Sequence, residues 1–259
     1  MAYFEFHPVD AFRPLVDAYW INQRDADGGA APDRVLPDGC IDLIFCGGPG
    51  GGRLFVSALI ERPTFFRAGG PAWFAGVRFR PAMARAILDV EPADCRDRDT
   101  PAAAVDRRFA ALEDRLRHCA SADTALAVLT QVVEARLAAR DADAAPPRVR
   151  QAIALLERGS DAAQVRDVAR AIGIAERSLQ RELMRWTGLA PKSLARILRM
   201  RRTLRAIRTG RAPLAEIAIV MGYADQAHMT RELKALAGYT PAALLRRGRN
   251  LQDARRVAT

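Results

Sequence analysis

The C-terminal half of the chain contains an internal repeat. The stretch VRDVARAIGIAERSLQRELMRWTGLAPKSL (Val165–Leu194) is followed by LAEIAIVMGYADQAHMTRELKALAGYTPAAL (Leu214–Leu244). Gly173 matches Gly222 at an offset of 49 residues, and Pro191 matches Pro241 at an offset of 50. Two copies are too few for a solenoid, which needs three or more stacked repeats. We therefore expect two separate copies of one supersecondary unit.

Each copy has the pattern of a helix-turn-helix. In the first copy apolar residues recur at helical spacing on both sides of Gly173, namely Val165, Val168, Ala169 and Ile172 before it and Leu179 and Leu183 after it. The second copy repeats this around Gly222, with Leu214, Ile217, Ala218, Met221 and Tyr223 on the inner side. A glycine at the turn tolerates the positive φ that a tight connection between two helices requires. The pattern predicts second helices over Glu176–Arg185 and about Gln226–Leu236.

The second helix of each copy has a polar outer face. In the first copy this face consists of Arg177, Ser178, Gln180, Arg181 and Arg185. In the second copy it consists of Gln226, Ala227, Thr230, Arg231 and Lys234. Arginine can make bidentate contacts to guanine and glutamine to adenine, so these residue types suit the reading of base edges in a major groove. An ordinary solvated helix face is the alternative reading of the same pattern.

A long helix is predicted between the two copies. Apolar residues continue at helical spacing over Pro191–Arg208, and Pro191 suits a first helical turn. At 1.5 Å per residue such a helix spans roughly 25 Å. It can hold two recognition helices about one duplex turn apart, near 34 Å.

The charge of the chain is divided unevenly. Residues 148–259 carry 23 basic and 9 acidic side chains, a net charge of +14, whereas residues 1–147 carry 17 and 21, a net charge of −4. Such a basic half is expected to bind a polyanion. Asp141–Pro147 (DADAAPP) indicates a linker between the halves. We expect a β-rich domain over 1–95, a helical connector over 96–140, the linker over 141–147, a DNA-binding domain over 148–250 and a basic tail over 251–259.

The C-terminal half resembles the DNA-binding domain of a known protein family. The segment from about Arg148 to Arg247 is similar to the DNA-binding domain of the AraC/XylS family of transcriptional regulators, most specifically through IAIVMGY (Ile217–Tyr223) and LAGYTP (Leu236–Pro241). The sequence departs from the family at Met229 and Leu233, where aromatic residues are frequent. It also departs at Ala227, where a polar residue is frequent.

The resemblance implies a module that places two recognition helices in successive major grooves on one face of double-stranded DNA. The family's contacts fall on Arg177, Gln180 and Arg181 in the first unit and on Gln226, Thr230 and Arg231 in the second. It implies a sequence-specific transcriptional regulator. Activation and repression both fit the residues, and we expect an activator. RNA polymerase is the expected protein partner and the cytoplasm the expected location. No catalytic activity and no cofactor are expected.

The first 90 residues indicate a β-rich domain. Short apolar runs are separated by glycine and proline turns, namely Val35–Leu36, Ile41–Cys46, Leu54–Ile60 and Trp73–Phe79. This favours a sandwich or barrel, so the whole chain is expected to be of the α+β class. Two amphipathic helices are predicted over 101–119 and 121–140, with Ser121 or Asp123 as the N-cap of the second. Their apolar faces could cover the barrel or pair two subunits into a homodimer.

Two segments of this half also resemble N-terminal domains that are attached to AraC-type DNA-binding domains. They are LPDGCIDLIF (Leu36–Phe45) and GVRFRP (Gly76–Pro81). The resemblance implies a sensory or dimerising domain with an unknown small-molecule effector. Candidate ligand-binding residues are Trp20, Asp42, Trp73 and Arg78. The alternatives are a pairing of Asp42 with an arginine such as Arg78 and plain core packing of the two tryptophans.

Two other classes of protein fit the sequence less well. A cupin-like enzyme needs a cluster of histidine ligands, and His7 is the sole histidine in the first 117 residues. An alkylation-sensing DNA-repair regulator needs a zinc-bound cysteine cluster, and Cys40, Cys46, Cys95 and Cys119 contain no C-x2-C pair. We therefore expect no metal site. We also expect no signal peptide and no membrane span, since no run of about 18 apolar residues occurs.

Overall fold

A computed structural model provides the structure of the protein. It describes residues 2–24, 33–66, 72–139, 145–159, 165–210 and 212–243. Most of the predicted linker, the end of the predicted DNA-binding domain after residue 243 and the predicted basic tail over 251–259 lie outside these residues. In the part of the chain that is described, no helix is long and apolar enough to cross a membrane.

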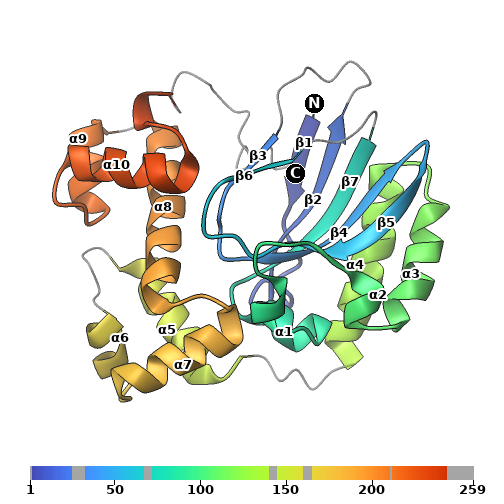
Figure 1. Cartoon of the computed structure of the whole chain (residues 1–259), viewed down its shortest axis with the longest axis horizontal. Coiled ribbons are helices and arrows are strands. Elements are labelled where there is room, and N and C mark those ends of the chain that lie inside the picture. The colour runs from blue at the N-terminus through green and yellow to red at the C-terminus, as the bar shows by residue number, and fades with distance from the viewer. Residues whose placement is uncertain are drawn as a thin grey trace.

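The N-terminal half is built on a six-stranded antiparallel sheet (Figure 1). In spatial order its strands are β1 (Ala2–Phe6), β2 (Val16–Arg24), β7 (Ala72–Phe79), β4 (Ile41–Gly48), β5 (Gly51–Val56) and β8 (Thr100–Pro101). A second, two-stranded sheet pairs β3 (Asp33–Val35) with β6 (Thr64–Phe66). Among the described strands, β1 and β8 each have a single neighbour, so the large sheet is open at both edges there rather than closed into a barrel.

The central strands of this sheet are buried on both faces. β7 is the middle strand, and its last six residues, Phe74–Phe79, are all buried. Gly76 lies under the ring of Trp20 on β2, where a Cβ atom would come within 2.3 Å of the ring. A glycine is therefore needed at this position for the tryptophan to lie flat across the sheet.

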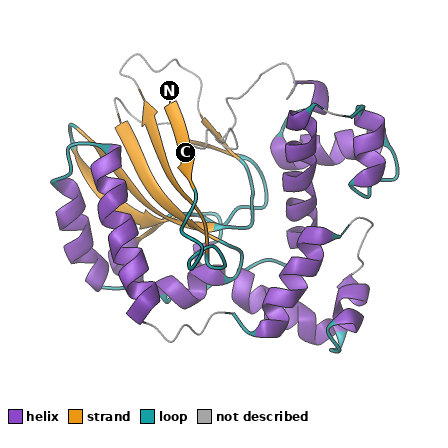
Figure 2. Ribbon diagram, turned by 180° about the vertical axis from the view of Figure 1, so that it is seen from behind, coloured by secondary structure: helices purple, strands orange, loops and turns teal. Residues whose placement is uncertain are grey.

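Helices cover one face of the sheet (Figure 2). The connecting segment forms α1 (Met83–Leu88), the 3₁₀-helix η1 (Pro92–Cys95), α2 (Ala102–Val105), α3 (Arg108–Arg117) and α4 (Ala122–Ala139). α4 packs against β2 and β7, and α3 against β5. The predicted helix over 101–119 is interrupted at Asp106, whose side chain accepts a hydrogen bond from the Arg108 amide at 2.9 Å. Ser121 rather than Asp123 accepts from the first turn of α4, from the Thr124 amide at 3.3 Å.

The apolar faces of α3 and α4 form part of the core. Phe109, Leu112 and Leu116 of α3 are buried, as are Leu129 and Val133 of α4. From the sequence, these faces could either cover the sheet domain or pair two subunits. In the structure they cover the sheet within a single chain.

The C-terminal half consists of helices, which Figure 1 shows beside the sheet domain. They are α5 (Pro147–Arg158), α6 (Val165–Ala171), α7 (Glu176–Thr187), α8 (Pro191–Thr209), α9 (Leu214–Val220) and α10 (Gln226–Ala237). Gly173 and Gly222 occupy the two turns with φ values of 71° and 77°, as the repeat predicts. The α+β class is confirmed, with the strands in the N-terminal half and the two helix-turn-helix units in the C-terminal half.

Candidate DNA-binding surface and sensory domain

The recognition helix of the first unit, α7, has the two faces that its sequence predicts. Leu179 and Leu183 are buried in the core of the unit. The predicted contact residues Arg177, Gln180, Arg181 and Arg185 are exposed, and Ser178 is half-buried. Gln180 lies 3.5 Å from the carboxylate of Glu176, one turn earlier, which is a long contact. The outer face of α7 is therefore available to an external partner.

The recognition helix of the second unit, α10, presents a matching face. Gln226, Ala227, Arg231 and Lys234 are exposed, and Thr230 is half-buried. Asp225 caps the helix, since its side chain accepts a hydrogen bond from the His228 amide at 2.6 Å. Met229 and Leu233 are fully buried. The substitutions at these two positions thus affect the packing of the unit and leave its outer face unchanged.

Arg181 and Arg231, which are equivalent in the repeat, are not bound to the acidic residues beside them in sequence. Glu182 pairs instead with Arg148 of α5, at 2.5 Å. Glu232 pairs with Arg199 of α8, at 2.8 Å. Within the described ranges, neither Arg181 nor Arg231 has an ion-pair partner. Both guanidinium groups therefore keep their hydrogen-bonding capacity for an external acceptor.

Sequence reasoning missed the arginines that hold the recognition helices. Arg199 donates to both carboxylate oxygens of Glu232 and to the carbonyl of Gly222 at 3.1 Å, and it stacks on Tyr223 with its Cζ 4.4 Å from the ring centroid. It thereby ties the turn and the recognition helix of the second unit to α8. Arg148 of α5 does the same for Glu182 of the first unit.

The structural repeat is therefore longer than the sequence match. Each unit consists of three helices, α5–α7 and α8–α10, and the first helix of each supplies an arginine to a glutamate of the third. The two equivalent glutamates, Glu182 and Glu232, were visible in the sequence. Their partners were not, because they lie 34 and 33 residues away.

Three of the four candidate ligand residues belong to one buried polar cluster on the sheet face that α3 and α4 do not cover. Trp20 Nε1 donates to Asp42 Oδ2 at 2.8 Å. Arg78 Nη1 donates to Glu5 at 2.9 Å, and Arg78 Nε lies 3.4 Å from Asp42 Oδ2 and 3.3 Å from Asp38. The pairing of Asp42 with Arg78 that the sequence suggested is thus present. Arg78 Nε is in ion-pair range of both carboxylates but makes no hydrogen bond within the described residues. These side chains pair mainly with one another and line neither of the two cavities described below.

Asp42 is buried beside the Arg78 guanidinium, which it shares with Asp38 and the still more deeply buried Glu5. Burial raises the pKa of Asp42 to about 7, although the nearby Arg78 charge acts to lower it. Burial also raises the pKa of the Cys40 thiol, at the edge of the cluster. Asp42 is therefore a group that exchanges its proton near neutral pH.

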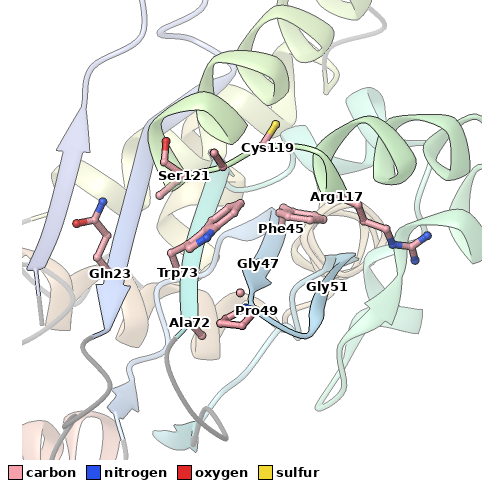
Figure 3. A pocket seen from close by; sticks show the side chains of 13 residues that line it. Gln23, Phe45, Gly47, Pro49, Gly51, Ala72, Trp73, Arg117, Cys119 and Ser121 are labelled. Carbon is pink, nitrogen blue, oxygen red and sulfur yellow. The ribbon is translucent and has the colours of Figure 1, made fainter.

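The fourth candidate, Trp73, lines a cavity of about 650 Å³ at the open end of the sheet (Figure 3). Its ring lies over Gly47, and its centroid is 5.5 Å from that of Phe45. Ser121 and Cys119, at the start of α4 and just before it, form the opposite wall. Arg117 lies at the side and is bound to Gly52, Glu113 and Asp114. The cavity thus offers an aromatic floor and few free polar groups.

The sheet domain contacts both helix-turn-helix units. Arg34 of β3 donates to the carbonyl of Ala237, the last residue of α10, at 3.1 Å and stacks on Tyr239 at 3.8 Å. At the first unit, Gly188 lies against Leu59 and η1, where a Cβ atom would meet Leu59 at 2.6 Å and the backbone of Pro92 at 3.0 Å. The N-terminal domain therefore contacts the C-terminal ends of both recognition helices.

All four cysteines are free thiols. Among the described residues, no three histidine, cysteine or acidic side chains are grouped so that they could hold a metal ion.

The chain matches two family models, one in each half. Residues 168–247 match a model described as a helix-turn-helix domain, which is AraC-type, and residues 4–101 match a domain of unknown function (DUF6597). No curated protein matches the chain. The matches confirm the resemblance found in the sequence, including the pairing of an AraC-type domain with a distinct N-terminal domain.

Several solved structures are similar to parts of the chain. The C-terminal domain of AraT, a response regulator from Geobacillus stearothermophilus, is 21% identical, with 44% of this chain and 90% of that chain covered and a TM-score of 0.38. A probable AraC family transcriptional regulator from Rhodopseudomonas palustris is also 21% identical, with coverages of 42% and 99% and a TM-score of 0.35. ToxT from Vibrio cholerae, bound to a naphthalenyl-butenoic acid, is 10% identical, with coverages of 88% and 98% and a TM-score of 0.46.

Proposed function

The chain carries an AraC-type helix-turn-helix domain, and from this premise we propose that it is a sequence-specific DNA-binding transcriptional regulator controlled through its N-terminal domain. The observation that carries the proposal is the matched pair of outer faces on α7 and α10. Equivalent arginines, Arg181 and Arg231, stand on them, and neither has an ion-pair partner in the described part of the chain. Such an arginine on a recognition helix is suited to a guanine edge or a phosphate.

The length of α8 supports binding to successive major grooves. Its 19 residues correspond to roughly 28 Å of helix at 1.5 Å per residue. Successive major-groove faces of a duplex are about 34 Å apart, so a connector of this length lets both recognition helices reach the same side of the DNA. The buried Arg199–Glu232 pair holds the second recognition helix to its unit, and the more exposed Arg148–Glu182 pair makes the equivalent contact in the first unit.

Control through the N-terminal domain is supported by two features. The cavity beneath the start of α4 has the size of a small-molecule site and an aromatic floor formed by Trp73 and Phe45. The same domain contacts the ends of both recognition helices. A ligand that shifts the sheet domain can therefore change the orientation of the two recognition helices relative to DNA. RNA polymerase as a partner, homodimer formation and a cytoplasmic location stay predictions from the sequence.

Selection of binding sites from random duplexes with the full chain tests the proposal. We expect enrichment of a site with two conserved elements about 10 base pairs apart, as two units in successive grooves require. Binding to the selected site should exceed binding to unrelated duplexes at physiological salt, where non-specific contacts are weakened. Equal affinity for all duplexes would contradict sequence-specific recognition.

A further inference from the structure

A second cavity lies at the boundary between the sheet domain and the helical domain. Its volume is about 480 Å³, and it is enclosed by the turn between β1 and β2, the residue after β7, the end of α5 and the middle of α8. Six arginines line it: Arg13, Arg80, Arg158, Arg201, Arg202 and Arg205. The first two belong to the sheet domain and the other four to the helical domain.

The acidic side chains of this cavity neutralise only part of its charge. Two carboxylates line it, and each is paired across the domain boundary. Glu157 pairs with Arg80 at 3.0 Å, and Asp17 pairs with Arg201 at 3.0 Å. Arg13 pairs with Asp10, which lies outside the lining, at 3.0 Å, and the formal charges of the lining residues and Asp10 sum to +3. Like charges held this close repel one another, and the repulsion is relieved by a bound anion.

One arginine of the cavity is incompletely hydrogen-bonded. Arg202 donates one Nη to the Gly159 carbonyl, but its Nε is buried and has no hydrogen-bond partner in the described part of the chain. Burial lowers the pKa of Arg202, and the neighbouring Arg199 charge lowers it further. A buried guanidinium nitrogen without an acceptor is costly, so the site is incomplete as it stands.

We infer that this cavity binds a small molecule with two or more negative charges, of the phosphate-ester class, held by Arg158, Arg202 and Arg205 of the helical domain together with Arg13 of the sheet domain. Arginine forks match phosphate oxygens in a bidentate manner. A single carboxylate would leave most of the excess charge uncompensated. A DNA duplex does not fit, because the sheet domain forms one wall of the cavity. The inference goes beyond the proposed function, since it requires neither DNA nor a ligand beside Trp73.

Calorimetric titration of the full chain with pyrophosphate, without DNA, tests this site. We expect saturable binding of pyrophosphate, and none of acetate, in a chloride buffer of physiological ionic strength. Arg158→Gln and Arg205→Gln change exposed side chains, so the chain should still fold, and each should weaken pyrophosphate binding roughly tenfold through loss of a charge-assisted hydrogen bond. Arg107→Gln, an equally exposed arginine outside the cavity, is the matched control and should bind as the wild type does.

Two results would overturn the inference. One is the absence of pyrophosphate binding to the wild-type chain. The other is a pattern in which Arg181→Gln, on the outer face of α7, weakens binding as much as Arg158→Gln does. That pattern would place the phosphate on the DNA-binding surface. Since no duplex is present, either result leaves the proposed DNA-binding function intact.

Discussion

At the scale of the residue, Arg181 and Arg231 are the side chains for which base reading can be tested directly. If each reads a base edge, Arg181→Ala or Arg231→Ala should cost roughly 1–3 kcal/mol on the selected site and relax the preference at one position. The two relaxed positions should lie about 10 base pairs apart, because the units occupy successive grooves. Binding profiles over all single-base variants of the site measure both effects.

Arg208, at the exposed end of α8, provides the comparison for this experiment. Arg208→Ala should weaken all sequences to a similar extent, as expected of a phosphate contact. If the Arg181 and Arg231 variants behave in that same uniform way, the two arginines bind phosphates and the base-reading role is wrong.

Asp42 should make the stability of the protein depend on pH. Its pKa is about 7 in the folded chain, against roughly 3.9 in an unfolded one. The folded state therefore holds the proton more tightly. Stability from this group is fully present below about pH 4 and is lost as the pH rises through 7. Between pH 5 and 8 the free energy of unfolding should fall by roughly 2–3 kcal/mol. A proton that is bound in the folded state and released in the unfolded state lowers this free energy by about 1.36 kcal/mol for each pH unit.

Chemical denaturation at several pH values tests this with Asp42→Asn, which has no proton to lose. The variant should show a much flatter pH profile than the wild type between pH 5 and 8. Asp123→Asn, an exposed aspartate on α4, should keep the wild-type profile. Identical slopes for the wild type and Asp42→Asn would show that Asp42 is ionised throughout this range.

At the scale of the element, the two helix-turn-helix units differ in how deeply their arginine–glutamate pairs are buried. The side chains of Arg199 and Glu232 are 17% and 8% exposed, whereas those of Arg148 and Glu182 are 55% and 23% exposed. Arg199→Ala should remove the short hydrogen bonds to the buried Glu232 carboxylate, which keeps the longer contact with Arg196 at 3.5 Å, and should destabilise the protein by roughly 1–3 kcal/mol. Arg148→Ala should change stability little, because water solvates the remaining glutamate. Urea denaturation compares the two, and equal losses would contradict the difference in burial.

The elements that the sequence predicted are those with a clear period. Helices α6, α7, α9 and α10 and the connector α8 follow from apolar spacing and from two turn glycines. The predicted bounds of α7, α8 and α10 differ from the observed ones by two residues or fewer. Strand β2 was missed, since a strand with both faces covered shows little alternation of polar and apolar residues. Strand β1 was missed as well, because its aromatic residues Tyr3, Phe4 and Phe6 do not alternate with polar ones. The helix α1 was missed as well, because six residues are too few to show a period.

The candidate site was predictable to a similar extent. The exposed residues of α7 and α10 follow from helical periodicity and lie where the repeat indicates. The residues that position them do not. Arg148 and Arg199 act on glutamates of other helices, and Arg34 reaches Ala237 across 203 residues of sequence. Contacts of this kind arise from tertiary packing and leave no local pattern in the sequence.

At the scale of the whole molecule, the two halves of the chain carry net charges of opposite sign and are in contact with each other. The half that carries the helix-turn-helix units has a net charge of +14, and the sheet domain and connector have −4. The long-range field of the acidic half acts against the approach of DNA at low salt and is screened as salt is added. The ion pairs Arg80–Glu157 and Arg201–Asp17 join the two halves at their boundary.

Removing the N-terminal half should therefore strengthen non-specific binding. A fragment over 145–259 keeps the fully buried Ala145 and all of α5 and carries the same +14. We expect it to bind arbitrary duplexes more tightly than the full chain at low salt, because the repulsion from the acidic half is gone. The difference should shrink above about 0.15 M salt, where the Debye length is near 8 Å. Both proteins should lose affinity steeply with salt, with similar log–log slopes, since the same side chains meet the phosphates. Fluorescence anisotropy over a salt series measures this, and circular dichroism checks that the fragment is helical. A helical fragment that binds no duplex at low salt would contradict the assignment of DNA binding to the C-terminal half.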